Sequence, residues 1–199
     1  AETVLTILDG DHVLSMKGWP GADTRGAVIA ELMPHKAKLA SVNVDCIGTG
    51  WERYLALKDE FGDVVHAVNV GSSPRDDKKF VNAKAEHYWA LRQTAQSGDL
   101  TGITQENLGP LAEKVIGQLT AIRYRHNAKG KVEIEGKDEL RKRGVKSPDH
   151  AESLMLANAV TGPQYGEMFA IESVVKDGVE EYGDVSLTQQ SPWRMGNQW

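Results

Sequence analysis

The chain has 199 residues, 40% of them hydrophobic, and a formal net charge of −5 at pH 7. This length and apolar content suffice for one domain with its own core and an appendage. The single cysteine, Cys46, excludes an internal disulfide and a cysteine-rich zinc site, and favours a reducing, cytoplasmic setting. No apolar run is long enough to span a membrane, and the net negative charge by itself argues against a nucleic-acid partner.

Apolar periodicity and turn residues predict alternating strands and helices. The β-branched residues at 3–8 indicate a strand, and the turn signal Asp9-Gly10-Asp11 returns the chain as a second hairpin arm at 12–17. The same patterns predict a helix at 24–33, a strand at 39–46, a helix at 51–61, a strand at 64–70, helices at 79–97 and 106–119, and a second hairpin with arms at 122–124 and 132–135. This order favours an α/β fold with a mixed β-sheet flanked by helices.

The most informative segment follows the second hairpin, where a basic helix ends at Gly144 and another begins at Ser147-Pro148. Serine is a favoured N-cap, and proline suits the first helical position. Asp149 and Glu152 are three residues apart, so they share a helix face and their carboxylates can converge. Paired carboxylates beside basic residues favour a metal-dependent enzyme that acts on phosphate. The alternative is a solvated basic helix followed by an ordinary acidic first turn.

Charge is unevenly distributed along the chain. Residues 123–146 carry nine basic and four acidic side chains, a net of +5 within a chain of −5. Such a patch can bind phosphate, although chance clustering on a solvated surface would give the same count. The basic residues are Arg123, Arg125, Lys129, Lys131, Lys137, Arg141, Lys142, Arg143 and Lys146.

Asp45 is a further candidate, because it lies at the end of the predicted strand 39–46, just before the turn Gly48-Thr49-Gly50. Ligands of open α/β sheets bind at the carboxyl ends of strands, although an Asp there is more often a turn or cap residue. The glycine turn lacks the lysine of a phosphate loop, so no nucleotide- or cofactor-binding residue is predicted. The six histidines show no metal-ligand spacing.

Four segments, in this order and with similar gaps, resemble the C-terminal nuclease domain of the large terminase subunit of tailed bacteriophages. The resemblance extends from about residue 3 to residue 160. It implies an RNase H-like fold, related to Holliday-junction resolvases and integrases. The segments are Val44-Asp45-Cys46-Ile47-Gly48-Thr49-Gly50, Phe80-Val81-Asn82-Ala83-Lys84-Ala85-Glu86-His87-Tyr88-Trp89, Lys137-Asp138-Glu139-Leu140-Arg141-Lys142-Arg143-Gly144 and Ser147-Pro148-Asp149-His150-Ala151-Glu152.

The resemblance implies an endonuclease that cuts concatemeric phage DNA during genome packaging, using Mg²⁺ or Mn²⁺. Asp45, Asp149 and Glu152 are implied as catalytic residues and metal ligands, with Glu152 standing where the family usually has a second Asp. Two cations roughly 3.5–4 Å apart would activate the attacking water and stabilise the leaving oxygen. The implied DNA-binding residues are Lys137, Arg141, Lys142, Arg143 and Lys146.

The resemblance also implies partners and a location. The partners are double-stranded DNA, the ATPase motor domain upstream in the same polypeptide, the portal protein and the small terminase subunit, with no membrane. The location is the cytoplasm of the infected bacterial host. We expect a nuclease domain at 1–160 and a tail at 161–199 that serves as a docking segment, a disordered tail being the alternative.

The start of the chain departs from the family pattern. The family's first metal-binding Asp lies on the central strand, before the strand that corresponds to 3–8, whereas this chain begins at Ala1. We therefore expect a sheet that lacks its first, central strand, with a gap between the hairpin and the Asp45 strand, and an impaired nuclease. Another RNase H-like nuclease, such as a junction resolvase, would share the acids; a non-catalytic DNA-binding or portal-docking module would need only the basic patch.

Overall fold

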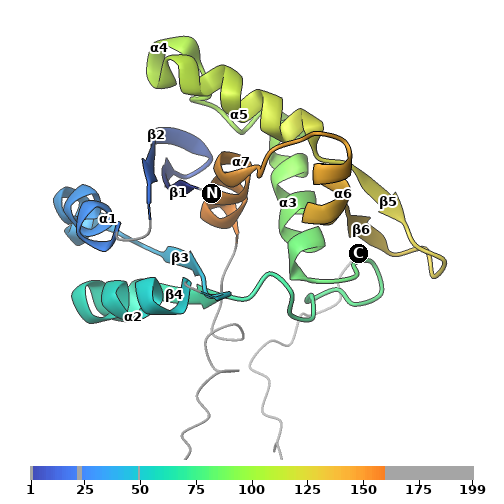
Figure 1. Ribbon diagram of the computed structural model, residues 1–199. Coiled ribbons are helices and arrows are strands. Elements are labelled where there is room, and N and C mark those ends of the chain that lie inside the picture. Colours follow the sequence, from blue (N-terminus) through green and yellow to red (C-terminus); the bar gives the residue numbers. More distant parts are fainter. Residues whose placement is uncertain (1, 22–23, 49, 160–199) are drawn as a thin grey trace, which may run out of the picture. The chain divides into compact units, whose positions relative to one another are not determined.

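The computed structural model describes residues 2–21, 24–48 and 50–159 (Figure 1). The predicted tail at 161–199 lies outside the described residues. The strands are β1 (Glu2–Asp9), β2 (His12–Pro20), β3 (Val42–Asp45), β4 (Val65–Val68), β5 (Tyr124–His126) and β6 (Val132–Ile134). The α-helices are α1 (Arg25–Leu32), α2 (Gly50–Phe61), α3 (Ala83–Ser97), α4 (Gln105–Leu108), α5 (Pro110–Ala121), α6 (Lys137–Lys142) and α7 (Asp149–Asn158), with 3-10 turns η1 (Met33–Lys38) and η2 (Gly62–Val64).

The described strands form three pairs: β1–β2 and β5–β6 are antiparallel, and β3–β4 is parallel. In the parallel pair, Asp45 at the end of β3 stands opposite Val68 at the end of β4. Over the described ranges, β1 and β3 are each paired along one edge, and no strand joins them. This agrees with the predicted gap between the first hairpin and the Asp45 strand.

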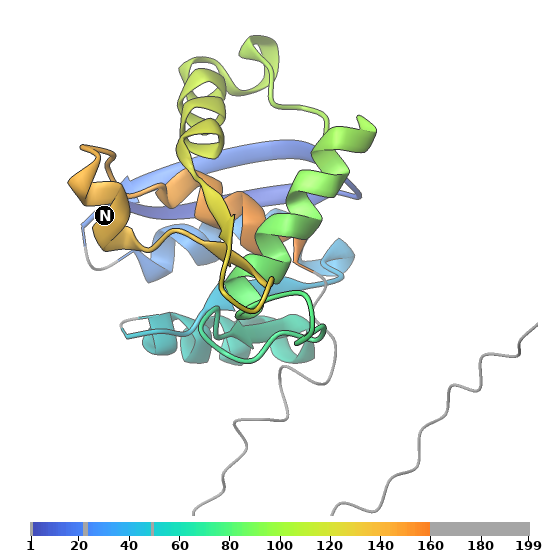
Figure 2. The ribbon, with the colours of Figure 1, turned by 90° about the vertical axis from the view of Figure 1, so that its right-hand side faces the viewer.

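Two apolar clusters hold the first hairpin and the β3–β4 pair to the helices, and a smaller one, of Phe80, Ala85 and Val132, holds β6 to α3. The larger joins β2 to α3, α4, α5 and α7, and Figure 2 shows the long hairpin beside α3 and α5. Its buried residues are Val13, Met16, Tyr88, Leu91, Leu108, Ala112, Val115, Leu154 and Met155. The second joins β1, α1, α2, β3 and β4 through Ile7, Val28, Leu32, Val42, Leu57, Phe61 and Val65. The hairpin and the β3–β4 pair therefore share a core although no hydrogen bonds of the described strands link them.

Two predicted helices differ from those observed. The helix expected at 79–97 begins at Ala83, because Asn82 caps it and Phe80 instead forms a parallel bridge with Val132 of β6. The helix expected at 106–119 is divided into α4 and α5 at Gly109, whose φ of 56° interrupts helical geometry. None of the helices within the described part of the chain is long and apolar enough to cross a membrane.

Candidate active site

Asp45 is held at the end of β3 by a turn that needs glycine. A Cβ added to Gly50 would lie 1.8 Å from the Asp45 carbonyl oxygen, so only glycine allows α2 to start against that carbonyl. The amide of Ile47 donates a hydrogen bond of 3.1 Å to Asp45 Oδ1. The turn therefore fixes the carboxylate at the carboxyl end of the parallel pair, where α/β folds bind ligands.

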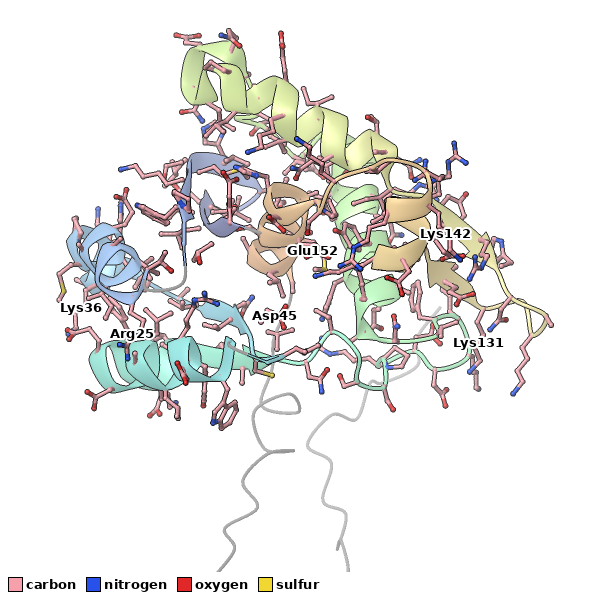
Figure 3. All side chains as sticks on the ribbon, in the orientation of Figure 1. Arg25, Lys36, Asp45, Lys131, Lys142 and Glu152 are labelled. Carbon is pink, nitrogen blue, oxygen red and sulfur yellow. The ribbon has the colours of Figure 1, made fainter. Side chains whose placement is uncertain are left out.

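Glu152 is placed by α7, which packs against both β1 and β3. Leu154 and Met155 are fully buried in the larger core, and they set the rotation of the helix. Asn43 of β3 donates to the carbonyl oxygens of Leu156 and Ala159, at 2.8 and 2.9 Å, which ties the end of α7 to the Asp45 strand. Figure 3 labels Glu152 on α7 and Asp45 below it at β3.

Two lysines from different helices contact the Glu152 carboxylate. Lys84 Nζ of α3 lies 3.0 Å from Oε1, and Lys137 Nζ of α6 lies 3.4 Å from Oε2. The side chains of Lys84 and Glu152 are 17% and 18% exposed, whereas that of Lys137 is 55% exposed. One oxygen of Glu152 is thus paired with a largely buried cation, and the other with a solvated one.

The charges of this cluster affect Asp45. Burial raises the pKa of the Asp45 carboxyl, and the negative charge of Glu152 raises it further, while Lys137 and Lys84 oppose the increase. Burial also raises the pKa of Tyr88 well above its ordinary value, with a smaller contribution from Glu152. Asp45, Glu152 and the two lysines therefore form one electrostatic cluster at the end of the β3–β4 pair, with a neutral phenol beside it.

Comparisons with known proteins were made for the whole chain. No protein-family model matches it, and neither does any curated protein. Solved structures of the nuclease domain of the large terminase subunit of bacterial virus Sf6 do match. A mutant form with manganese has a TM-score of 0.64 and 19% identity, and covers 78% of this chain and 82% of that one. The unmutated domain has a TM-score of 0.62 and 21% identity, and the match covers 79% of this chain and 81% of that one. A mutant with calcium has a TM-score of 0.63 and 20% identity, and the match covers 78% of this chain and 81% of that one.

The fold is that of a terminase nuclease domain. This confirms the predicted RNase H-like architecture, since the matched regions span most of both chains. At this level of identity the likeness establishes the fold alone, so the chemistry must be argued from the site.

The donors in this site fit a hard divalent cation. Asp45 and Glu152 supply carboxylate oxygen, which Mg²⁺ and Mn²⁺ prefer, and Mg²⁺ commonly takes one or two protein carboxylates together with waters. Over residues 2–159, apart from the undescribed gaps, no group of three His, Cys, Asp or Glu side chains is arranged to hold a metal. Of the three predicted ligands, Asp45 and Glu152 are linked electrostatically, because the charge of Glu152 raises the pKa of the Asp45 carboxyl.

Asp149, the third predicted ligand, has other partners. Its Oδ2 accepts a hydrogen bond of 2.8 Å from the backbone amide of Glu2, and its Oδ1 accepts one from the Ser147 hydroxyl. The residue at the N-cap of α7 is Pro148, without a side-chain cap bond, so the prediction that Ser147 caps the helix is wrong. The role of Asp149 as a metal ligand stays a prediction.

The predicted DNA-binding run is dispersed over different environments. Lys137 contacts Glu152, and Arg143 turns inward to Glu135 and to the carbonyl of Ala121. Arg141, Lys142 and Lys146 are exposed, and Figure 3 shows Lys142 on the α6 side of the site. All five predicted residues are therefore exposed, but Lys137 and Arg143 also pair with the largely buried carboxylates of Glu152 and Glu135.

Sequence reasoning assigned no role to Lys84 or Tyr88, although both lie in a segment that carried the resemblance. One signal was available for Lys84. A cation in the first turn of a helix is disfavoured by the helix dipole, so a lysine two residues after the N-cap Asn82 indicates a compensating partner elsewhere.

Proposed function

We propose that this chain is the nuclease domain of a phage large terminase subunit, a divalent-metal-dependent endonuclease that cuts concatemeric DNA during genome packaging. The supporting observation is the Asp45–Glu152 cluster, held at the carboxyl end of a parallel strand pair in a fold of this type. Mg²⁺ or Mn²⁺ are the cations proposed, and double-stranded DNA is the substrate.

The carboxylates and the exposed lysine of the cluster would have different roles in the reaction. A divalent ion, when bound, lowers the pKa of a coordinated water and stabilises the developing charge on the leaving oxygen. Asp45 and Glu152 would hold that ion, with Asp149 as a further proposed ligand. Lys137, 55% exposed, can leave Glu152 and neutralise a backbone phosphate.

DNA would be held mainly through its backbone. Arg141, Lys142 and Lys146 are exposed next to Lys137 along the chain, and lysine and arginine contacts to phosphate give affinity without sequence selectivity. Weak sequence preference suits an enzyme that must cut diverse DNA. Arg143 is the predicted DNA contact with the least support, because its guanidinium already binds Glu135 and the carbonyl of Ala121.

The wider assembly is proposed from the resemblance. It comprises an ATPase motor upstream in the same polypeptide, the portal protein, the small terminase subunit and a portal-docking role for residues 161–199. The reaction would take place in the cytoplasm of the infected host.

A plasmid-nicking assay with Mn²⁺ tests the proposal. Asp45→Asn and Glu152→Gln should each reduce nicking by at least about tenfold, because each removes a charged ligand. Asp149→Asn shows whether the third predicted ligand takes part. Asp63→Asn is the matched control, since that carboxylate is fully exposed and, within the described part of the chain, forms an ion pair with Lys58 alone. Undiminished nicking by both site variants would favour a DNA-binding or docking module.

A further inference from the structure

A cluster of rings and cations lies between α3 and the β5–β6 hairpin, on the opposite side of α3 from α7 (Figure 1, Figure 2). Trp89 of α3 meets Tyr124 of β5 edge to face, with 5.4 Å between the ring centres. The guanidinium carbon of Arg92 lies 4.6 Å from the centre of the Trp89 ring and 5.1 Å from that of Tyr124. Lys79 Nζ lies 5.2 Å from the centre of the Trp89 ring. We call these four residues the aromatic cluster.

The acids of the described residues do not neutralise the positive charges of the aromatic cluster. Within that part of the chain neither Arg92 nor Lys79 forms an ion pair, and both cations lie against rings. Arg125, the residue after Tyr124, is by contrast paired with both Glu133 and Glu139. The Tyr124 side chain is 45% exposed, although it is a large aromatic residue. The aromatic cluster therefore offers positive charge and aromatic surface to solvent at the same place.

An unpaired DNA base has the chemistry that fits this surface. Bases outside a duplex stack on tyrosine rings and on guanidinium planes, and cations attract the adjoining phosphates. Duplex DNA has no base face to offer, because its bases stack on one another and present only their edges in the grooves. The aromatic cluster therefore favours a single-stranded segment over a duplex.

The hairpin tip extends this surface with further positive charge. A hollow of about 370 Å³ is lined there by Val81, Asn127, Ala128, Lys129 and Lys131. Asn127 follows Tyr124 by three residues, which is about 10 Å along an extended strand. The two lysines of the hollow are thus placed to attract the phosphates of a strand that stacks on Tyr124.

The helix α3 links the aromatic cluster to the carboxylate site. It contacts both α7 and β6. Trp89 comes five residues after Lys84, which contacts Glu152, so the two positions are about 7.5 Å apart along the helix axis. A strand whose phosphate lies at the carboxylates would therefore have bases only a few nucleotides away at the aromatic cluster, since stacked nucleotides are spaced by about 3.4 Å.

We infer that Tyr124 and Arg92 form a stacking site for an unpaired DNA base beside the point of cutting. The inference rests on the proposed function and names a part of its substrate, a single-stranded segment or frayed strand end. Trp89 holds the guanidinium of Arg92 and the Tyr124 ring in place, because it contacts both of them. The exposed ring and the guanidinium plane make the contact with the base.

Fluorescence anisotropy with two labelled probes, in the presence of EDTA so that no cutting occurs, tests the inference. The probes are a short oligothymidine and a blunt GC-rich duplex. Tyr124→Leu should weaken oligothymidine binding by at least about fivefold, because it removes the ring, whereas Tyr124→Phe should bind as the unchanged chain does. Arg92→Lys, which keeps the charge but loses the plane, should also weaken it. Duplex binding should be the same for all of these chains.

The matched control is Trp51→Leu, which removes another exposed aromatic side chain, 40% exposed on α2, and should alter neither affinity. Unchanged oligothymidine binding by Tyr124→Leu would overturn the inference, and so would an equal loss for both probes. If Tyr124→Leu does not fold, unchanged oligothymidine binding by Arg92→Lys has the same force. Tighter binding of polyglutamate than of oligothymidine would show instead that the surface receives an acidic peptide.

These outcomes are separate from those of the proposed function. Insensitivity to Tyr124→Leu, with plasmid nicking lost in Asp45→Asn and Glu152→Gln, would remove the stacking site and leave the nuclease standing. Oligothymidine binding that depends on Tyr124, with nicking undiminished in both carboxylate variants, would leave the stacking site and overturn the proposed metal site.

Discussion

Arg143 and Arg141 lie two residues apart in the basic run, yet their surroundings differ, and we predict different roles for them. Arg143 donates from Nε to Glu135 Oε2 at 3.1 Å and from Nη2 to Glu135 Oε1, and Nη2 also donates to the Ala121 carbonyl at 2.7 Å. Glu135 is 9% exposed and also accepts from the amide of Arg123. Among the described residues, Arg141 forms an ion pair with Asp138 alone, and the two side chains are 74% and 83% exposed.

Arg143→Ala should therefore destabilise the fold, because it leaves the buried Glu135 carboxylate without its charged partner. Breaking a fully buried pair costs about 3–5 kcal/mol. Since 28% of the Arg143 side chain is exposed, water can partly replace it, and we expect a loss of about 2–3 kcal/mol. Arg141→Ala should change stability by no more than about 0.5 kcal/mol, because exposed pairs contribute little.

Urea unfolding followed by circular dichroism measures both free energies on the same scale. DNA retention at rising salt, measured where each variant is folded, should fall for Arg141→Ala and remain at the wild-type level for Arg143→Ala. Equal stability of the two variants, with DNA binding lost in Arg143→Ala, would refute the reasoning and show that Arg143 contacts DNA.

Three further predictions concern the site, the core and the surface. NMR titration should give the Asp45 carboxyl a pKa above its ordinary value of 3.8, and Glu152→Gln should lower that pKa by removing a negative charge. Because the folded state holds the proton more tightly than the unfolded state, ionisation of Asp45 should reduce stability as the pH rises through its pKa in the folded state. Leu154→Ala, at 0% exposure, should cost about 2–5 kcal/mol in urea unfolding, whereas Leu55→Ala, at 50%, should cost less than about 1. Lys142→Ala should weaken DNA retention and reduce its salt dependence by about one counterion, and an unchanged salt slope would remove Lys142 from the interface.

Much of the fold follows from local patterns. The first hairpin and the Asp45 strand have their own turn signals and form close to where the sequence predicts them, whereas α7 is capped at Pro148 instead of Ser147. The start of α3 could not be predicted, because Phe80 has helical periodicity but pairs with Val132, more than fifty residues away. Long-range pairing of this kind overrides local propensity.

Prediction of the site from the sequence is limited by long-range packing in the same way. The strand end and the helix face indicated Asp45 and Glu152 separately, and the spacing rule added Asp149. Sharing a helix face does not fix where a side chain points, and Asp149 bonds to the amide of Glu2 at the opposite end of the described chain. Lys84 was missed because nothing in its neighbourhood along the sequence indicates Glu152, which only the packing of α3 against α7 reveals.

The most direct test of the account is the location of the divalent ion. Titrating Mn²⁺ into the ¹⁵N-labelled chain broadens the amide resonances near the bound ion. The account predicts that broadening at low Mn²⁺ is centred on Asp45 and Glu152, and that Glu152→Gln removes it. Broadening centred on Glu2 and Asp149 instead, or spread evenly over the acidic surface, would contradict the assignment of the site.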